Sequence, residues 1–423
     1  MSDTGLPARK SAVYLLDQVL GEGRLMSELL GAGVLDQLAP DDRARAARLA
    51  QDTLRGMERA DRILQKHLSK YPPLHVRNAL RVGTVELCNG AAAHGVVNAM
   101  VELVSRHKHL SHLKGLTNAV LRKVAADGPE AWQALRAPRL PKWLRGPLAQ
   151  AWGNEEMVAM EIAHFKGAPL DLTAKSDPDA VARDTGGVLL PTGSVRIENA
   201  GQVSAMPGFD EGAWWVQDAA AALPVRMLAP QSDEEILDLC AAPGGKTMQL
   251  AAAGARVTAV DDSPSRMKRV RENLTRTGLK AKLMVQDALE TEGMFDAVML
   301  DAPCSATGTI RRHPDLPHAK DGSEFGDLIE LQSQLIDHAW SLVKPGGRLL
   351  FCTCSLLPDE GEVQVDEALE RHSDMTVEPS EALLPEIDPA WRSSEGGVRI
   401  RPDFWLDKGG LDGFYMACLR KSA

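Results

Sequence analysis

Five apolar segments with strand character alternate with helical segments in the C-terminal half of the chain, and this alternation constrains the fold most strongly. The predicted strands contain EEILDLC, ARVTAVD, AKLMVQD, FDAVMLD and GRLLFCT, and the intervening helices include KTMQLAAA, SPSRMKRVRENLTRTG and LIELQSQLIDHAWSLV. Strands that alternate with helices form parallel sheets through right-handed crossovers. We therefore predict a doubly wound, Rossmann-like α/β domain that binds its ligands at the carboxyl ends of the strands.

Four of the five predicted strands end in residues with functional side chains. Three end in aspartates, namely Asp261, Asp287 and Asp301, and a fourth ends in Cys354. Because the carboxyl ends of parallel strands meet at one edge of a sheet, we expect these side chains to line one site. The alternative is that the acids only cap the following helices. That interpretation is credible for the neighbouring Asp262 and weaker for three strand ends together.

The first predicted strand leads into a glycine-rich turn, DLCAAPGGKT. A P-loop requires a glycine five positions before the Gly-Lys pair; Cys240 holds that position, which excludes the nucleoside triphosphatase interpretation. The dinucleotide fingerprint G-x-G-x-x-G is also missing. The turn still suits an adenosine ligand, with Asp261 accepting hydrogen bonds from the ribose and Asp287 meeting the adenine edge. The expected cofactor loop comprises Cys240, Ala241, Ala242, Pro243, Gly244, Gly245 and Lys246.

Two cysteines follow on the same predicted sheet, Cys304 in VMLDAPCSATG and Cys354 in RLLFCTCSLLP. A thiol beside a nucleotide-like cofactor indicates covalent chemistry on an electrophilic ring. A free cysteine has a pKa of about 8.5 and ionises more readily near positive charge. Three residues are candidates to supply that charge: Lys246, Arg311 and Arg312. The remaining cysteines are expected to be structural, with Cys240 offering only backbone contacts and the others buried: Cys88, Cys352 and Cys418.

Charge is distributed unevenly along the 423 residues, a length that allows several domains. The net charge is −10, yet residues 1–150 carry a net charge of +8 and the remainder −18. Apolar residues recur at three- and four-residue spacing from residue 9 to about residue 126, which predicts a compact helical bundle. The basic bundle is the candidate RNA-binding domain. On charge alone, a solvated helical surface without a polyanionic partner is the alternative.

The middle of the chain is predicted to join these two parts. Four prolines between residues 127 and 150 indicate a linker or a short connecting helix, and residues 151–230 mix short strands with turns, which predicts a small α+β subdomain. Trp214 and Trp215 are candidates for base stacking, but adjacent strand residues face opposite ways, and we favour core packing for both. The expected domains are therefore 1–135, 136–230 and 231–423.

The sequence offers no sign of a metal site or of a membrane segment. His107, His109 and His112 lie in a basic stretch without a cysteine or carboxylate partner. Neither a long apolar run nor a signal peptide is present, and six scattered cysteines do not form a disulfide framework. We therefore expect a cytoplasmic, monomeric enzyme without a metal or a membrane partner.

The motifs resemble those of a known family in content and order. DLCAAPGGKT, VQDA, LDAPCSATGTIRRHPD, CTCS and DGFYMACLRK are similar to the motifs of the NOL/NOP/Sun family of RNA 5-methylcytosine methyltransferases. GVVNAMVELVSRH and KGLTNAVLRK are similar to the signature of NusB-like RNA-binding domains. Together they resemble the ribosomal small-subunit members of that family. The resemblance implies an all-α NusB-like bundle, a class I methyltransferase domain, S-adenosyl-L-methionine as cofactor and a cytosine of 16S ribosomal RNA as substrate.

The resemblance also assigns roles to the site residues. C5 of cytosine is a poor nucleophile, so a thiolate adds to C6 and pushes electron density to C5. The family pattern implies that Cys354 attacks and that Cys304 assists product release, although DNA cytosine methyltransferases use the Pro-Cys cysteine, which corresponds to Cys304. Asp301 would contact the methionine end of the cofactor or hydrogen-bond cytosine N3.

Three residues after the Cys304 motif are candidates for contact with RNA phosphate or with the flipped nucleotide, namely Arg311, Arg312 and His313. A solvated loop is the alternative for this stretch. At the level of the whole chain, two other functions remain possible interpretations of the motifs. One is the same chemistry on transfer RNA, and the other is a noncatalytic role in ribosome assembly.

Overall fold

The structure is a computed structural model that describes residues 5–198, 200–384 and 387–423. The chain divides into two compact units. The first comprises Met1–Gly167 and Ile310–Asp321, and the second comprises Ala168–Thr309 and Gly322–Ala423. The boundaries predicted after residues 135 and 230 fall inside these units, because the helices that follow residue 135 belong to the same unit as the N-terminal bundle.

The first unit is all-α, as the apolar spacing predicts. Every residue of the central helix from 78 to 88 is buried, so the other helices surround it on all sides. Leu15, Leu80, Met100 and Leu121 are fully buried in the shared core. The helices are α1 (Leu6–Glu22), α2 (Met26–Gly31), α3 (Pro40–Arg55), α4 (Met57–Gln65), α5 (Leu74–Cys88, the central helix), α6 (Ala93–Ser105), α7 (Lys114–Ala134), α8 (Lys142–Trp152), α9 (Asn154–Lys166) and α14 (Leu316–Ala319).

The segment 127–150 is more helical than its prolines predict. Helix α7 continues through Pro129, and α8 includes Pro147. Trp132 explains the extension of α7, because its buried side chain packs in the core of the bundle. The guanidinium of Arg59 also donates hydrogen bonds to three carbonyl groups at the end of α7 and just after it, those of Trp132, Leu135 and Arg136. Tertiary packing therefore outweighs the local propensity of proline to end a helix.

A small antiparallel sheet begins the second unit and matches the predicted α+β subdomain. Its order is β2-β3-β1-β4, and α10 (Pro178–Thr185) accompanies it. Trp214 is buried against Leu172 on one face, and Trp215 is buried against Met248 on the other. The prediction that both tryptophans pack in cores is confirmed. The strands are β1 (Leu170–Ala174), β2 (Val188–Leu189), β3 (Val195–Ile197) and β4 (Trp214–Val216).

The large sheet has the order β10-β12-β9-β8-β5-β6-β7, with β11 paired to β12. The five predicted strands are β5 to β9, and they pair in parallel as expected. The sheet is nevertheless mixed, because β12 pairs antiparallel with β9. Strands β10 and β11 in turn pair antiparallel with β12. The strands are β5 (Glu235–Leu239), β6 (Arg256–Asp261), β7 (Lys282–Val285), β8 (Phe295–Asp301), β9 (Val343–Thr353), β10 (Met375–Val377), β11 (Val398–Ile400) and β12 (Phe414–Lys421).

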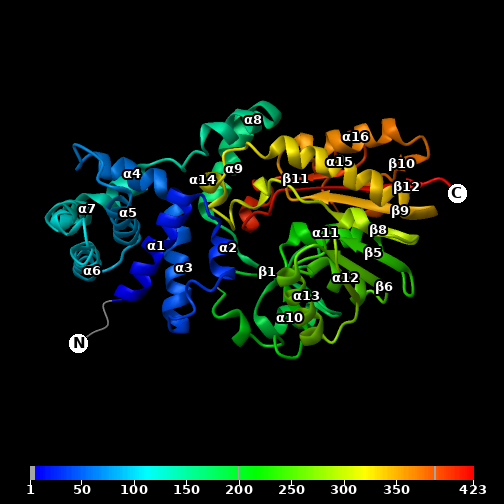
Figure 1. Cartoon of the computed structure of the whole chain (residues 1–423), viewed down its shortest axis with the longest axis horizontal. Helices are drawn as coiled ribbons and strands as arrows, with labels where there is room; N and C mark the ends of the chain where they lie inside the picture. The colour runs from blue at the N-terminus through cyan, green and yellow to red at the C-terminus, as the bar shows by residue number, and fades with distance from the viewer. Residues whose placement is uncertain (1–4, 199, 385–386) are drawn as a thin grey trace. The chain divides into compact units, whose positions relative to one another are not determined.

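Helices cover both faces of this sheet (Figure 1). Residues of β9 alternate between the two cores: Leu350 and Cys352 pack on the side of α11, and Leu349 and Phe351 pack on the side of α15. Both faces are therefore apolar, as parallel strands between helical layers require. The helices are α11 (Ala219–Leu228), α12 (Gly245–Ala252) and α13 (Pro264–Thr277) on one face, α15 (Phe325–Ser341) and α16 (Glu362–Arg371) on the other, and the short α17 (Ser380–Leu383).

Candidate active site

A cavity of about 460 Å³ opens at the carboxyl ends of the parallel strands in the second unit. It brings together seven of the residues singled out in the sequence: Cys240, Ala242, Asp261, Asp287, Asp301, Cys304 and Cys354. Leu331 and Leu335 of α15 supply an apolar wall that sequence reasoning missed, because their helical spacing indicates only a buried face. The other predicted loop residues do not line the cavity: Ala241, Pro243 and Gly244 lie in the turn, and Gly245 and Lys246 begin α12.

The glycine-rich turn connects β5 to α12. A hydrogen bond between two buried side chains, Asp238 near the end of β5 and Thr247 in α12, joins the two elements. The hydroxyl of Thr247 donates a hydrogen bond to Oδ2 of Asp238 at 2.5 Å. Burial raises the pKa of Asp238 to about 7, against the opposing effect of Thr247. Gly244 begins α12 with φ of 99°, and a Cβ atom there would lie 3.0 Å from the side chain of Val270. The backbone therefore needs glycine at this point to pass close to α13.

Asp261 connects this turn to the next loop. Its carboxylate accepts hydrogen bonds from the amides of Ala242 at 3.2 Å and Ser263 at 3.0 Å, and it is 2% exposed. Arg266 forms an ion pair with the same carboxylate at 3.0 Å. Asp261 thus fixes the geometry of two backbone segments at the wall of the cavity.

One aspartate of this site caps a helix, but it is Asp287 and not Asp262, the residue for which the sequence makes capping the credible interpretation. Asp287 is exposed, and its Oδ1 accepts a hydrogen bond from the amide of Leu289 at 2.9 Å, which caps the short helix that follows. Asp262 does not cap α13, because Ser263 is the N-cap residue there. Instead, Asp262 pairs with Arg266 at 2.9 Å.

Lys246 links the turn to the end of β8. Its Nζ donates to Oδ2 of Asp301 at 2.7 Å, and the lysine is 7% exposed. Burial acts to lower the pKa of Lys246, but the charge and hydrogen bond of Asp301, together with the neighbouring Cys352 and Cys354, outweigh burial and raise the pKa. The ammonium therefore stays charged beside the strand that carries Cys352 and Cys354.

The two candidate catalytic thiols face each other across the ends of β8 and β9. The Sγ atoms of Cys304 and Cys354 lie 3.5 Å apart, and both cysteines are free. The hydrogen bond with Cys354 and burial raise the pKa of Cys304 well above its usual value, so Cys304 stays protonated near neutral pH. Cys352 is fully buried, with its Sγ 3.5 Å from Oδ1 of Asp301, which confirms that it is a core residue.

A buried carboxylate that sequence reasoning missed supports the loop of Cys304. Glu360 is fully buried and accepts hydrogen bonds from the amide of Ser305 at 2.9 Å and from Nε2 of Gln332 at 3.0 Å. Gln332 also donates to the carbonyl of Pro303 at 2.8 Å, and Thr353 donates to the carbonyl of Glu360 at 2.7 Å. Glu360 thus connects the segment before Cys354 to the segment around Cys304. No motif in the sequence marks it.

The basic residues named near Cys304 belong to different units. Lys246 lies in the second unit with the thiols, whereas Arg311, Arg312 and His313 belong to the first. Arg311 is fully buried there, and its carbonyl accepts a hydrogen bond from Arg55 at 3.0 Å. His313 is exposed.

Across residues 5–198, 200–384 and 387–423, no cluster of three or more His, Cys, Asp or Glu side chains is arranged to hold a metal ion. In the same ranges, no helix has the length and apolar character needed to cross a bilayer.

Comparison with known proteins gives matches over both parts of the chain. A family model described as 16S rRNA methyltransferase RsmB/F matches residues 225–420, and the NusB family model matches residues 6–126. Ribosomal RNA small subunit methyltransferase B of Erwinia tasmaniensis is 34% identical over 441 residues, covering 97% of each chain. The protein of the same name from Vibrio cholerae is 35% identical, covering 98% of this chain and 97% of its own.

The fold has a counterpart among solved structures. The crystal structure of PH0851 matches with a TM-score of 0.77 and 23% sequence identity, and the match covers 100% of this chain and 99% of that one. At that identity the likeness concerns the fold, and it extends over both units. The helical bundle and the mixed α/β sheet therefore occur together in another protein.

Proposed function

Because the chain belongs to the ribosomal RNA small subunit methyltransferase B family, we propose that it methylates C5 of a cytosine in 16S ribosomal RNA through a covalent bond between Cys354 and C6. The observation that carries this proposal is the pair of thiols, Cys304 and Cys354, 3.5 Å apart beside the cavity. Methyl transfer to a nitrogen or a hydroxyl needs no thiol, since those atoms have their own lone pairs. C5 of a pyrimidine needs a nucleophile at C6 to become reactive.

The residues of the cavity fit S-adenosyl-L-methionine. Four aspartates line it, namely Asp261, Asp262, Asp287 and Asp301, and Arg266 is the basic side chain among them. This acidic lining suits a cationic sulfonium compound whose ribose hydroxyls donate hydrogen bonds. We assign the ribose to Asp261, the adenine edge to Asp287, and the remainder of the cofactor to the turn Cys240–Lys246 and to Asp301. When bound, the cofactor supplies an electrophilic methyl group to C5.

Each thiol has a distinct task in the proposed reaction. Sγ of Cys354 bonds to C6 of the cytosine, and the electron pair of the C5–C6 double bond moves toward C5. After methyl transfer, the proton on C5 passes to a water molecule, the C5–C6 double bond re-forms, and the bond between Sγ and C6 breaks to release Sγ as a thiolate. Cys304 is protonated and adjacent, so it can donate a hydrogen bond to the departing sulfur and promote release. Asp301 lines the same cavity, where its carboxylate serves the methionine end of the cofactor or cytosine N3.

The proposal is tested by trapping the covalent adduct. Cys304→Ala and Cys354→Ala variants are incubated with S-adenosyl-L-methionine and 16S ribosomal RNA and run on denaturing gels. Cys304→Ala should accumulate a protein–RNA adduct, and Cys354→Ala should form none. Cys418→Ala, which removes a buried cysteine from β12 outside the cavity, is the matched control and should behave like the unmodified protein. The reverse pattern would exchange the roles of Cys304 and Cys354.

Bisulfite mapping of RNA from a strain that lacks the protein identifies the substrate. Loss of one 5-methylcytosine in 16S ribosomal RNA supports the proposal and names the base. Loss confined to transfer RNA moves the same chemistry to that substrate. No loss in any RNA would favour a noncatalytic role in ribosome assembly.

A further inference from the structure

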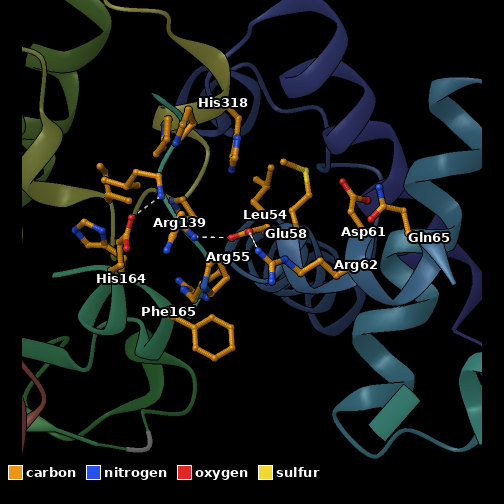
Figure 2. Close-up of a pocket in the computed structure, with 18 of the residues that line it drawn as sticks. Leu54, Arg55, Glu58, Asp61, Arg62, Gln65, Arg139, His164, Phe165 and His318 are labelled. Carbon is orange, nitrogen blue, oxygen red and sulfur yellow. Dashed lines mark hydrogen bonds and ion pairs between the residues drawn. The ribbon is translucent and has the colours of Figure 1, made fainter. Parts of the chain in front are cut away.

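A second cavity, of about 350 Å³, lies within the first unit (Figure 2). Its walls come from the end of α3, from α4, from residues 138–141, from α9 and from residues 310–318. Much of the lining is apolar or aromatic, including Leu54, Met57 and Phe165. The volume falls in the range of small-ligand sites. It shares no lining residue with the catalytic cavity, so it is a separate candidate site.

Two polar side chains of this cavity have buried nitrogen atoms without a hydrogen-bond partner. His164 is 6% exposed, and within the described part of the chain neither of its ring nitrogens has a hydrogen-bond partner. The same holds for Nε of Arg55, which is also buried. Buried polar groups are nearly always hydrogen-bonded, because leaving them unpaired is costly. These two side chains therefore point to a polar ligand in the cavity.

The imidazole of His164 has a defined hydrogen-bonding character. Burial, together with the charges of Arg311 and Arg55, lowers the pKa of His164 to about 3. The ring is neutral near neutral pH, so it offers one donor and one acceptor. Nε of Arg55 adds a second donor. A ligand that satisfies both side chains must itself present donors and acceptors along one edge.

The acidic residues of the cavity are already neutralised by arginines. Glu58 pairs with Arg136 at 2.5 Å, and, as Figure 2 shows, it also pairs with Arg62 at 2.8 Å and accepts a hydrogen bond from the amide of Arg139 at 2.6 Å. Glu161 pairs with Arg145 at 2.9 Å. Asp61 is bound in the same way by Arg81. Because the carboxylates are occupied and the side chains of Arg62 and Arg139 are exposed, the rim favours an anionic group such as phosphate.

We propose that this cavity holds an unpaired nucleobase of the RNA, with His164 and Arg55 on the base edge and the rim arginines on the adjoining phosphate. The inference rests on the proposed function in taking RNA as the substrate. A base has flat apolar faces and a polar edge, which matches the apolar walls and the unpaired donors and acceptor. An apolar side chain of a protein partner would fill the walls but leave the ring of His164 and Nε of Arg55 unpaired.

Photo-crosslinking tests the location directly. The full-length protein is irradiated with 4-thiouridine 5′-monophosphate, and the modified peptides are mapped by mass spectrometry. We expect adducts in α4 or α9, competed by uridine 5′-monophosphate and lost in His164→Leu. Adducts confined to peptides of the second unit, or no adduct in α4 and α9 at all, would overturn the proposal.

RNA affinity provides a second test that does not depend on methylation. Binding of a single-stranded RNA is measured without cofactor for His164→Leu and Arg62→Gln. Arg106→Gln is the matched control, because Arg62 and Arg106 are both exposed and both pair with a glutamate one helical turn earlier. We expect binding about five- to tenfold weaker for His164→Leu and for Arg62→Gln, as for loss of one contact, and nearly unchanged for Arg106→Gln.

The outcomes separate this proposal from the proposed function. Thermal melting and cofactor binding report whether His164→Leu is folded, and Arg62→Gln decides the question if it is not. Equal losses for Arg62→Gln and Arg106→Gln would indicate general charge attraction and overturn the base site. Failure of C5 methylation with crosslinks still in α4 or α9 would remove the proposed reaction and leave the nucleotide site standing.

Discussion

The sulfur atoms of Cys304 and Cys354 lie 3.5 Å apart although they are 50 positions apart in the chain. Their strands explain the approach, because β8 and β9 pair in parallel with Asp301 opposite Cys352. The two loops therefore leave the sheet side by side and at the same level. Glu360 then fixes the loops to each other through Ser305 and Gln332. The spacing of the thiols is thus a property of the sheet register and of one buried carboxylate.

Replacing Glu360 tests that relationship. Glu360→Gln keeps the shape of the side chain, but if its oxygen stays at Oε1 to accept from the Ser305 amide and Gln332, its NH2 group takes the place of Oε2, where the hydroxyl of Ser305 donates. We expect a loss of about 1–3 kcal/mol in the free energy of unfolding. The rate of methyl transfer should fall while the dissociation constant for S-adenosyl-L-methionine stays unchanged, because Glu360 does not line the cavity. Urea unfolding, radiolabelled methyl transfer and calorimetry measure these quantities.

The control for this substitution lies seven residues further on, in α16. Glu367→Gln makes the same chemical change at an exposed position and should alter neither stability nor rate. If Glu360→Gln methylates RNA at the normal rate, the spacing of the thiols does not depend on this carboxylate.

The sequence predicts the parallel core and the place of the site, because both follow from local patterns. Apolar runs define β5 to β9, and polar residues at their ends identify Asp261, Asp301 and Cys354 in advance. The antiparallel β12 escapes prediction, since an apolar strand carries no sign of its direction. Glu360 escapes as well, because a buried carboxylate resembles a surface one until its partners from distant loops are known.

The cavity of the first unit is harder still to predict. It depends on residues 310–318, which follow the Cys304 motif in sequence but belong to the N-terminal bundle in space. Met26 shows the connection, because its amide donates a hydrogen bond to Asp315 at 2.8 Å. No local sequence pattern indicates that residues 310–321 pack with the N-terminal helices, because this packing depends on contacts between residues far apart in the chain. The sequence accordingly places Arg311 in a loop, whereas the structure buries it.

The Lys246–Asp301 pair should behave as a coupled unit. Lys246→Met leaves Asp301 without its partner in a partly buried site, and Asp301→Asn leaves a buried ammonium unpaired. We expect each single variant to lose about 1–3 kcal/mol of stability, and the double variant to lose less than the sum. A double-mutant cycle from urea unfolding measures the coupling. Strict additivity of the two losses would show that the 2.7 Å contact contributes nothing.

Gly244 should be intolerant of any side chain. Its φ of 99° disfavours L residues, and a Cβ atom would lie 3.0 Å from Val270. Gly244→Ala should therefore distort the turn and weaken S-adenosyl-L-methionine binding by about tenfold or more, a change of about 1.4 kcal/mol. Gly326→Ala is the control, since it lies in the first turn of α15 with no atom near its Cβ position. Calorimetric titration compares the two, and equal affinities would contradict the expectation.

Stability should fall on the acid side because of two buried histidines in the first unit. Burial lowers the pKa of His164 to about 3 and that of His318 to about 4, from 6.5 in the unfolded chain. Between those values the unfolded state binds protons that the folded state does not. The contribution of these histidines to the free energy of unfolding is therefore fully present above about pH 6.5. It falls as the pH drops toward 4, by up to about 1.4 kcal/mol per pH unit for each histidine.

Urea unfolding between pH 4.5 and pH 7.5, followed by amide exchange in α9, measures this slope for the unmodified protein and for His164→Leu. The slope of the variant should be smaller by the contribution of one histidine, up to about 1.4 kcal/mol per pH unit, while Asp238, whose pKa is raised to about 7, contributes the same opposing slope to both proteins. His94→Leu, at an exposed position on α6, should leave the slope unchanged. A slope that is the same in His164→Leu and in the unmodified protein would mean that His164 binds protons equally in the folded and unfolded states, which would contradict its lowered pKa.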